Sequence, residues 1–204
     1  LEEGAIRAFQ VPRPQKADQL YDQAARKASR VLEEYKDSEL VDDAMFLMGR
    51  SFYWRGEYLR AVQSFRDLEI NFPYSDYFNK ARYWRALCME KQRVYDQAQQ
   101  LYRTLFEEAE EEIAALAGWR LGEIAFQNED YIAAVQEYQS ALDAFPGAKI
   151  RAGLWLNLGS ALLALENSAR YPDAEQAFQK AIRERPDRDQ KYRALLNRGR
   201  VRYL

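Results

Sequence analysis

The side chains that enzymes use most often for acid–base catalysis and metal binding are nearly absent from this sequence. It contains no histidine, which is the commonest general base and metal ligand near neutral pH. Its single cysteine, Cys88, has no second thiol or imidazole with which to bind zinc or form a nucleophilic pair. Cys88 lies beside Leu87 and Met89, which favours a buried, inert thiol. We therefore expect a non-catalytic protein with no metal and no cofactor.

Two charged segments are the next candidates for chemistry. Glutamates at 107, 108, 110, 111 and 112 form an acidic run. A solvated helix start, where negative charge interacts favourably with the helix dipole, is the simpler interpretation, and a site for a metal or a basic partner is the alternative. From Lys180 to Arg202 there are nine Lys or Arg and three Asp or Glu. An exposed terminal helix pair explains this excess, and an acidic partner or lipid headgroups are the alternative.

Composition places these residues in a helical protein. The 204 residues are 48% hydrophobic and 30% charged, with only nine glycines and six prolines. A net charge of -2 argues against nucleic acid as a partner, because phosphate binding needs a concentrated basic surface. No apolar run approaches the roughly 18 residues of a membrane span. The segment begins at Leu1 without a methionine, so a cleaved signal or lipid anchor upstream is compatible with it.

A Tyr-x-x-Ala motif recurs through the chain. Its tyrosines stand at 21, 58, 95, 131 and 171, so the steps are 37, 37, 36 and 40 residues. Seven and ten residues after each tyrosine come apolar residues, which places the alanine and both of these residues on one side of a helix. Pro73, Pro146 and Pro186 then end three of these helices.

A second helical segment precedes each of the later tyrosines and carries a small residue. Gly49, Ala86 and Gly122 each stand twelve residues before the motif's alanine, and Gly159 stands fifteen before, with three extra residues in the turn at 166–170. A glycine inside a helix costs about 1 kcal/mol relative to alanine, so its recurrence predicts the close approach of a neighbouring helix.

This order of elements resembles the tetratricopeptide repeat: a helix, a short turn, a second helix and a proline, repeated with a period in the thirties of residues. The fourth unit matches that family best, with Leu158-Gly159, Ala174, Phe178, Ala181 and Pro186; the second lacks both the glycine and the proline. The resemblance implies an all-α, right-handed superhelical solenoid of antiparallel helix pairs. The Phe72-Pro73-Tyr74-Ser75 link also resembles those of bacterial periplasmic and outer-membrane lipoprotein members. It implies a periplasmic or outer-membrane location, with the cytoplasm as the alternative.

The organisation expected from this pattern is one repeat array. Its parts are an extended lead-in at 1–16, a capping helix at 17–36, four repeats at 41–73, 77–108, 112–146 and 150–186, and a terminal helix at 190–204, so that 17–204 forms a single domain.

One face of each repeat's first helix is the expected binding surface. Phe46, Arg50 and Tyr53 are spaced four and three apart, which puts them on one side of a helix. The resemblance implies that this side lines the concave groove. The same register selects Tyr83, Leu87, Trp119 and Phe126, and the positions one step further round the helix add Trp84, Arg120 and Asn157. Aromatic and arginine side chains are enriched at binding hot spots, although aromatics at helical spacing are also typical of a core.

Two functions follow from the resemblance. The favoured one is a non-catalytic protein–protein interaction scaffold that binds a peptide or a partner subunit in its groove, in a bacterial envelope assembly. The alternative is a recruiting or regulatory module of a larger enzyme or secretion system. A signal peptide with a lipid-attachment cysteine upstream favours the first function, and a downstream catalytic domain favours the second.

Overall fold

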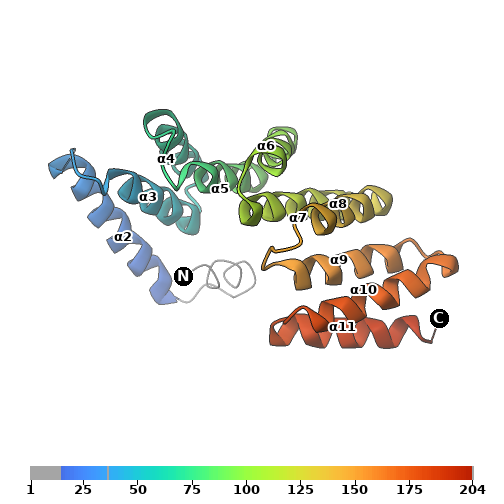
Figure 1. Cartoon of the computed structure of the whole chain (residues 1–204). Helices are drawn as coiled ribbons and strands as arrows, with labels where there is room; N and C mark the ends of the chain where they lie inside the picture. Colours follow the sequence, from blue (N-terminus) through green and yellow to red (C-terminus); the bar gives the residue numbers. More distant parts are fainter. Residues whose placement is uncertain (1–14, 36, 204) are drawn as a thin grey trace. The chain divides into compact units, whose positions relative to one another are not determined.

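The described part of the chain is helical throughout. The computed structural model describes residues 15–35 and 37–203, which form ten α-helices, one short 3-10 helix and no strand (Figure 1). The all-α fold class is therefore confirmed. Residues 1–14 of the predicted lead-in lie outside the described residues, and residues 15 and 16 belong to the first helix. None of the helices within the described ranges is long and apolar enough to cross a membrane.

The chain divides into two compact units. Unit 1, residues 1–94, contains α2 (Gln15–Glu34), α3 (Val41–Arg55), α4 (Tyr58–Asn71) and α5 (Phe78–Lys91). Each of these helices packs against the next one in sequence, and α5 also contacts α3. The first helices of neighbouring pairs therefore lie against one another, as they do in a stack of helical hairpins.

Unit 2, residues 95–204, has the same arrangement. Its elements are α6 (Tyr95–Glu108), α7 (Glu111–Gln127), α8 (Tyr131–Ala144), α9 (Arg151–Ala164), the 3-10 helix η1 (Ser168–Arg170), α10 (Tyr171–Arg183) and α11 (Arg188–Val201). Consecutive helices pack together, and α11 also contacts α9. The terminal helix begins at Arg188 rather than 190 because Asp187 caps it by accepting a 2.8 Å hydrogen bond from the backbone N–H of Gln190.

The Tyr-x-x-Ala motif marks the start of the second helix of each pair. Tyr58, Tyr95, Tyr131 and Tyr171 are the first residues of α4, α6, α8 and α10. The alanine three residues later is completely buried in all four helices. Tyr21 differs, because it lies inside α2 rather than at its start.

The glycines of the first helices make room for an aromatic ring of the second. A Cβ atom added at Gly49 would lie 2.6 Å from Cε1 of Phe65, and one at Gly159 would lie 2.7 Å from Cε1 of Phe178. Gly122 faces the ring of Tyr138 in the same way. Real Cβ atoms do not approach other atoms this closely, so each helix pair depends on the missing side chain. The predicted packing role of these glycines is confirmed.

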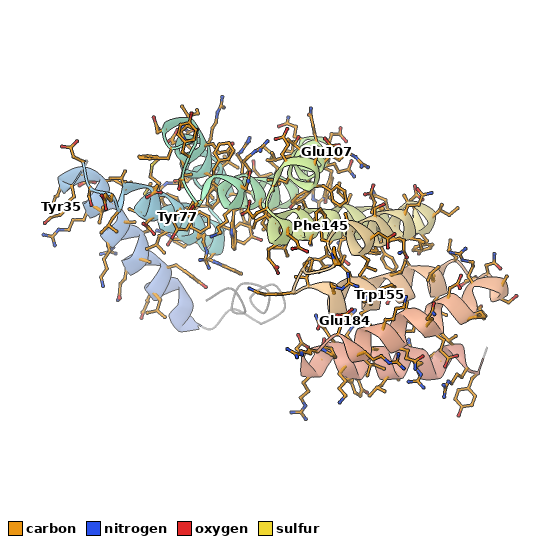
Figure 2. The ribbon with its side chains drawn as sticks, in the orientation of Figure 1. Tyr35, Tyr77, Glu107, Phe145, Trp155 and Glu184 are labelled. Carbon is orange, nitrogen blue, oxygen red and sulfur yellow. The ribbon has the colours of Figure 1, made fainter. Side chains whose placement is uncertain are left out.

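The links between repeats fold back onto the acidic first turn of the preceding first helix. In unit 1, Ser75 donates a 2.6 Å hydrogen bond to Asp42, and the hydroxyl of Tyr77 donates one of 2.6 Å to Asp43. Figure 2 labels Tyr77, which lies in the link between α4 and α5. The bond to Asp43 raises the pKa of Tyr77 to about 12. In unit 2, carboxylate oxygens of Glu111 and Glu112 accept from the backbone N–H groups of residues 147 and 149, at 2.7 and 3.1 Å.

Part of the acidic run therefore has a structural role that the sequence did not reveal. Glu111 and Glu112 occupy the first turn of α7, where helix-start charge was expected. Their carboxylates also hold the link that leads to α9, one repeat further along the chain. Among the described residues, no group of three or more Cys, Asp or Glu side chains is placed to hold a metal ion.

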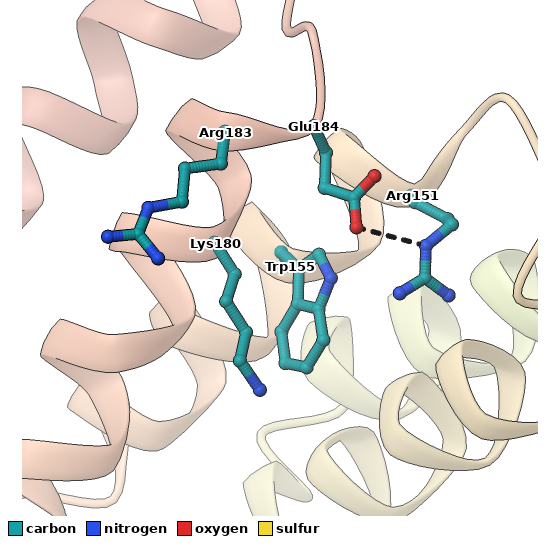
Figure 3. A pocket seen from close by; sticks show the side chains of 5 residues that line it. All are labelled: Arg151, Trp155, Lys180, Arg183 and Glu184. Carbon is teal, nitrogen blue, oxygen red and sulfur yellow. Dashed lines mark hydrogen bonds and ion pairs between the residues drawn. The ribbon is translucent and has the colours of Figure 1, made fainter.

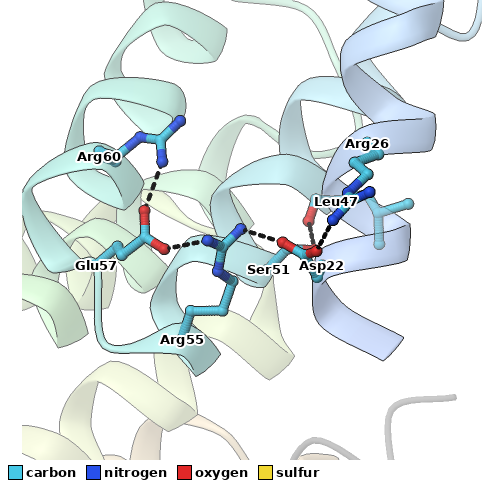
Figure 4. Close-up of polar contacts among 7 residues, drawn as sticks. All are labelled: Asp22, Arg26, Leu47, Ser51, Arg55, Glu57 and Arg60. Atoms are coloured by element: carbon cyan, nitrogen blue, oxygen red, sulfur yellow. Dashed lines mark hydrogen bonds and ion pairs between the residues drawn. The ribbon is translucent and has the colours of Figure 1, made fainter. Parts of the chain in front are cut away.

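An ion-pair chain ties the cap helix to the first repeat. Arg55, near the end of α3, pairs with Asp22 of α2 at 3.0 Å and with Glu57 at 2.7 Å (Figure 4). Glu57 in turn accepts from Arg60 at 2.6 Å. Asp22, a polar residue of the first Tyr-x-x-Ala motif, thus joins two helices rather than simply facing water.

The glycine packing predicts opposite effects of alanine at two positions of unit 2. Gly159→Ala should lower the free energy of unfolding by up to roughly 2 kcal/mol, because overpacking against the buried Phe178 costs about 1–3 kcal/mol and the gain in helix propensity is about 1 kcal/mol. Gly199→Ala in α11 is the matched control: its Cβ meets no atom within 4 Å, so it should stabilise the protein by up to about 1 kcal/mol. Urea denaturation measures both variants. Equal stabilisation by the two would contradict the close approach.

The burial of Cys88 predicts a slow thiol reaction. Cys88 is completely buried in α5, and burial raises its pKa from 9.0 to about 12. The thiolate fraction at pH 8 is then about a thousandfold below that of an exposed thiol. Labelling of the native protein with an aromatic disulfide reagent should be at least about a hundredfold slower than labelling of the denatured chain. Comparable rates in the two states would show that the thiol is accessible.

Candidate functional site

In unit 1 the predicted groove residues of α3 form a packed aromatic cluster. The ring of Phe46 lies 4.6 Å from that of Tyr77, stacked, and 5.9 Å from that of Phe65. The ring of Tyr53 meets Trp84 edge to face at 5.0 Å. Phe46 and Tyr53 are only 8% and 5% exposed. Their spacing does place them together, but the cluster is closed rather than open to solvent.

The guanidinium of Arg50 packs against the rings of this cluster. Its guanidinium carbon is 5.2 Å from the ring centre of Trp84 and 5.8 Å from that of Phe46, distances at which cation and ring attract each other. The side chain is partly buried, and its Nε atom is shielded from water and has no hydrogen-bond partner. Burial lowers the pKa of Arg50, yet an arginine remains charged at neutral pH. The site therefore presents a positive charge that is supported by aromatic rings and lacks a counter-ion among the described residues.

The groove residues predicted on α5 are buried, and one of them, Trp84, contacts Arg50. Tyr83, Trp84 and Leu87 are 4%, 6% and 2% exposed. Trp84 carries the Arg50 guanidinium on its ring, and that ring also packs on Phe65 at 6.5 Å. Trp84 can therefore position Arg50, but all three α5 side chains offer little exposed area of their own.

In unit 2 the predicted residues are more open. Trp119, Arg120 and Phe126 of α7 are each partly exposed. The Arg120 guanidinium lies 5.8 Å from the Trp119 ring, and the Phe126 ring meets Tyr131 edge to face at 5.2 Å. The indole nitrogen of Trp119 is shielded from water and donates no hydrogen bond. This surface therefore offers aromatic area, a positive charge and an unused donor.

A polar bridge joins three helices of unit 2 beside these residues. One carboxylate oxygen of Glu123 in α7 accepts from the hydroxyl of Tyr138 at 2.9 Å and from the amide nitrogen of Asn157 in α9 at 2.6 Å. Burial and the Glu123 charge raise the pKa of Tyr138. Asn157 thus has its donor engaged within the protein, which leaves its amide oxygen for a ligand.

Glu123 falls on the groove register of α7, between Trp119 and Phe126, but is not among the predicted site residues. Its signal was a single acidic side chain in the part of α7 that follows the two glutamates of the first turn, IAALAGWRLGEIAFQ. A buried or half-buried carboxylate needs donors, so its position indicated partners on neighbouring helices. Which partners it has depends on the packing of α8 and α9.

Comparisons with known proteins agree with this repeat architecture. Residues 43–75 and 89–149 match the tetratricopeptide repeat family. Comparison with curated protein sequences gave no match.

Three solved structures illustrate the likeness of the fold. The C-terminal part of a TPR repeat-containing protein from Cytophaga hutchinsonii has a TM-score of 0.69 and 15% identity, over 91% of this chain and 66% of that one. This chain thus spans slightly less than two thirds of it. BtubC from P. vanneervenii has a TM-score of 0.60 and 18% identity, over 84% of this chain and 72% of that one.

MamA from Desulfovibrio magneticus RS-1 has a TM-score of 0.56 and 19% identity, over 84% of this chain and 96% of that one. At such low identities these likenesses show the fold alone, a stack of helical hairpins. The two sequence matches establish tetratricopeptide repeats at residues 43–75 and 89–149, and the recurring Tyr-x-x-Ala and glycine positions show helical hairpins of the same kind in the rest of the described repeats.

Proposed function

We propose that this chain is a non-catalytic module that binds a peptide or loop of another protein on the first helices of its repeats. A tetratricopeptide fold is that of a protein–protein interaction module, and the finer assignment rests on the two surfaces described above. The single observation that carries it is Arg50, a charged side chain held on aromatic rings without an acceptor for its Nε.

The environment of Arg50 favours an acidic side chain as its ligand. A buried donor without an acceptor is unfavourable, and a carboxylate oxygen supplies both the acceptor and the missing negative charge. The rings of Trp84 and Phe46 exclude water on one side of the guanidinium, which strengthens the attraction to a carboxylate. The part of a partner that binds unit 1 should therefore contain an aspartate, a glutamate or a terminal carboxylate.

The surface of unit 2 favours an extended or loop segment. The Asn157 amide oxygen can accept from a backbone N–H. Phe126 and the Trp119 ring supply apolar area for side chains of the same segment. These groups suit a polypeptide better than a small molecule, because a polypeptide offers donors and acceptors at regular spacing.

We also propose a bacterial envelope assembly as the setting, on the resemblance of the Phe72-Pro73-Tyr74-Ser75 link. The alternative is a recruiting module of a larger enzyme or secretion system. The gene sequence upstream of the codon for Leu1 tests the first: a signal peptide followed by a lipid-attachment cysteine supports it. A catalytic domain encoded downstream supports the alternative.

Selection of peptides from a displayed random library tests the role of Arg50. Enriched peptides should share an Asp or Glu, and Arg50→Gln should weaken the binding of a selected peptide about tenfold or more, because a charge-assisted hydrogen bond contributes about 1.5–3 kcal/mol. Isothermal titration calorimetry measures the dissociation constant.

Arg66→Gln is the matched control, because Arg66 is an exposed arginine of the same unit on α4. The control should bind within about twofold of the wild type, since a distant exposed charge contributes little. Peptides without acidic residues, or equal binding by the Arg50 variant, would refute this site. Circular dichroism confirms that both variants remain helical.

A further inference from the structure

Unit 2 contains a pocket whose residues belong to neither candidate surface. It has a volume of about 370 Å³ and is lined by Arg151, Trp155, Lys180, Arg183 and Glu184 from the end of the α9–α10 helix pair (Figure 3). Trp155 and Asn157 are two residues apart on α9, so their side chains leave that helix in directions roughly 200° apart. The pocket is therefore on a different side of α9 from the proposed peptide surface.

The charges of the pocket do not balance. Arg151 is engaged within the protein: its Nε donates to Glu184 at 3.1 Å, and one terminal nitrogen donates to the carbonyl of Leu142 at 2.8 Å. Glu184, the only carboxylate that lines the pocket, is thus matched with Arg151. Lys180 and Arg183 form no ion pair with any described residue. The pocket accordingly presents two uncompensated positive charges.

Trp155 supplies an unused hydrogen-bond donor at the same place. Its side chain is more than nine-tenths buried, and its indole nitrogen is shielded from water without an acceptor. The Lys180 ammonium lies 4.1 Å over the ring centre, and Figure 3 shows the indole between Lys180 on one side and Glu184 with Arg151 on the other. Lys180 is therefore held against the pocket rather than extended into solvent. The indole nitrogen lies on the edge of the ring that faces Glu184 and Arg151, so the groups of this pocket that complement an oxyanion are the cations of Lys180 and Arg183 (Figure 3).

We propose that this pocket binds a phosphate monoester. Such a group carries a charge of about -1.5 to -2 at pH 7 and three acceptor oxygens. Its charge matches the two cations that no carboxylate pairs, and its oxygens can accept from Lys180 and Arg183. A single carboxylate would neutralise only one of the two charges. The volume is that of a small-molecule site and leaves room for the group to which the phosphate is attached.

Titration calorimetry at low ionic strength tests the proposal with O-phosphoserine and a phosphoserine peptide as probes. The wild-type chain should bind each probe at one saturable site. The double variant Lys180→Gln, Arg183→Gln should bind at least about tenfold more weakly, because it loses both charge-assisted contacts. Trp155→Phe keeps an aromatic ring under Lys180 but holds the ammonium less strongly, so a loss of at most a few-fold is expected. The single variant Lys180→Gln, at a partly exposed position, tests the Lys180 contact alone. It should weaken the binding of both probes by less than the double variant does.

The matched control is the double variant Arg188→Gln, Lys191→Gln, which removes the same charge from exposed positions of α11 in the same unit. It should bind the probes like the wild type. Equal weakening by both double variants would indicate a diffuse basic surface and overturn the proposal, as would the absence of saturable binding. An unphosphorylated peptide with two adjacent aspartates is the competing anion, and tighter binding of this peptide than of phosphoserine also overturns it.

The two probes identify the source of the phosphate. Tighter binding of the phosphoserine peptide supports the site with a phosphorylated protein as ligand, and equal affinity supports it with a small phosphoester. The pocket variant should bind the peptide selected for Arg50 as the wild type does, because the pocket and Arg50 lie in different units. Failure of the peptide proposal is thereby distinguishable from failure of this one.

Discussion

In three of the helix pairs, α3–α4, α7–α8 and α9–α10, the contact on which the pair depends is an aromatic ring of the second helix packed against a glycine of the first. Phe65 occupies the space at Gly49, Tyr138 that at Gly122, and Phe178 a third such space in α9. Any β-carbon at these glycines would overlap the ring, so the two helices could not approach as they do. The alanine at the start of each second helix is buried for the same reason, since a larger side chain would separate the pair. These three hairpins can stack because each one is first closed by this contact.

The links between hairpins are held to the preceding repeat by hydrogen bonds. Side chains or backbone groups of the links reach back to the acidic first turn of the preceding first helix, at Asp42 and Asp43 in unit 1 and at Glu111 and Glu112 in unit 2. These hydrogen bonds join residues 33 to 37 positions apart, which is one repeat. Negative charge at a helix start is favourable by itself, and here it also satisfies donors that would otherwise be exposed in an irregular segment.

Hairpin packing leaves certain polar groups without partners, and one of these groups carries the proposed function. The aromatic cluster of unit 1 supports Arg50 but contains no acceptor for it. In unit 2 the Trp119 and Trp155 indole nitrogens are shielded by neighbouring groups without being bonded to them. Glu123 shows the contrasting case, because its carboxylate receives two donors from neighbouring helices and serves the fold. Arg50, whose side chain is partly exposed, is the group of this kind that the fold offers to a ligand.

The sequence by itself determined the helices, the position of the motif at their starts, and the need for glycine in the first helices. Those features follow from local periodicity and from residue types a few positions apart. It also placed Phe46, Arg50 and Tyr53 on one side of α3. It did not determine how exposed Tyr53 and Tyr83 are, because either side of an amphipathic helix can be covered by a neighbour. The isolation of Arg50, the partners of Glu123 and the pocket between Trp155 and Lys180 were decided only by the tertiary structure. Each depends on which side chains from distant parts of the chain come into contact, and helix periodicity carries no information about those contacts.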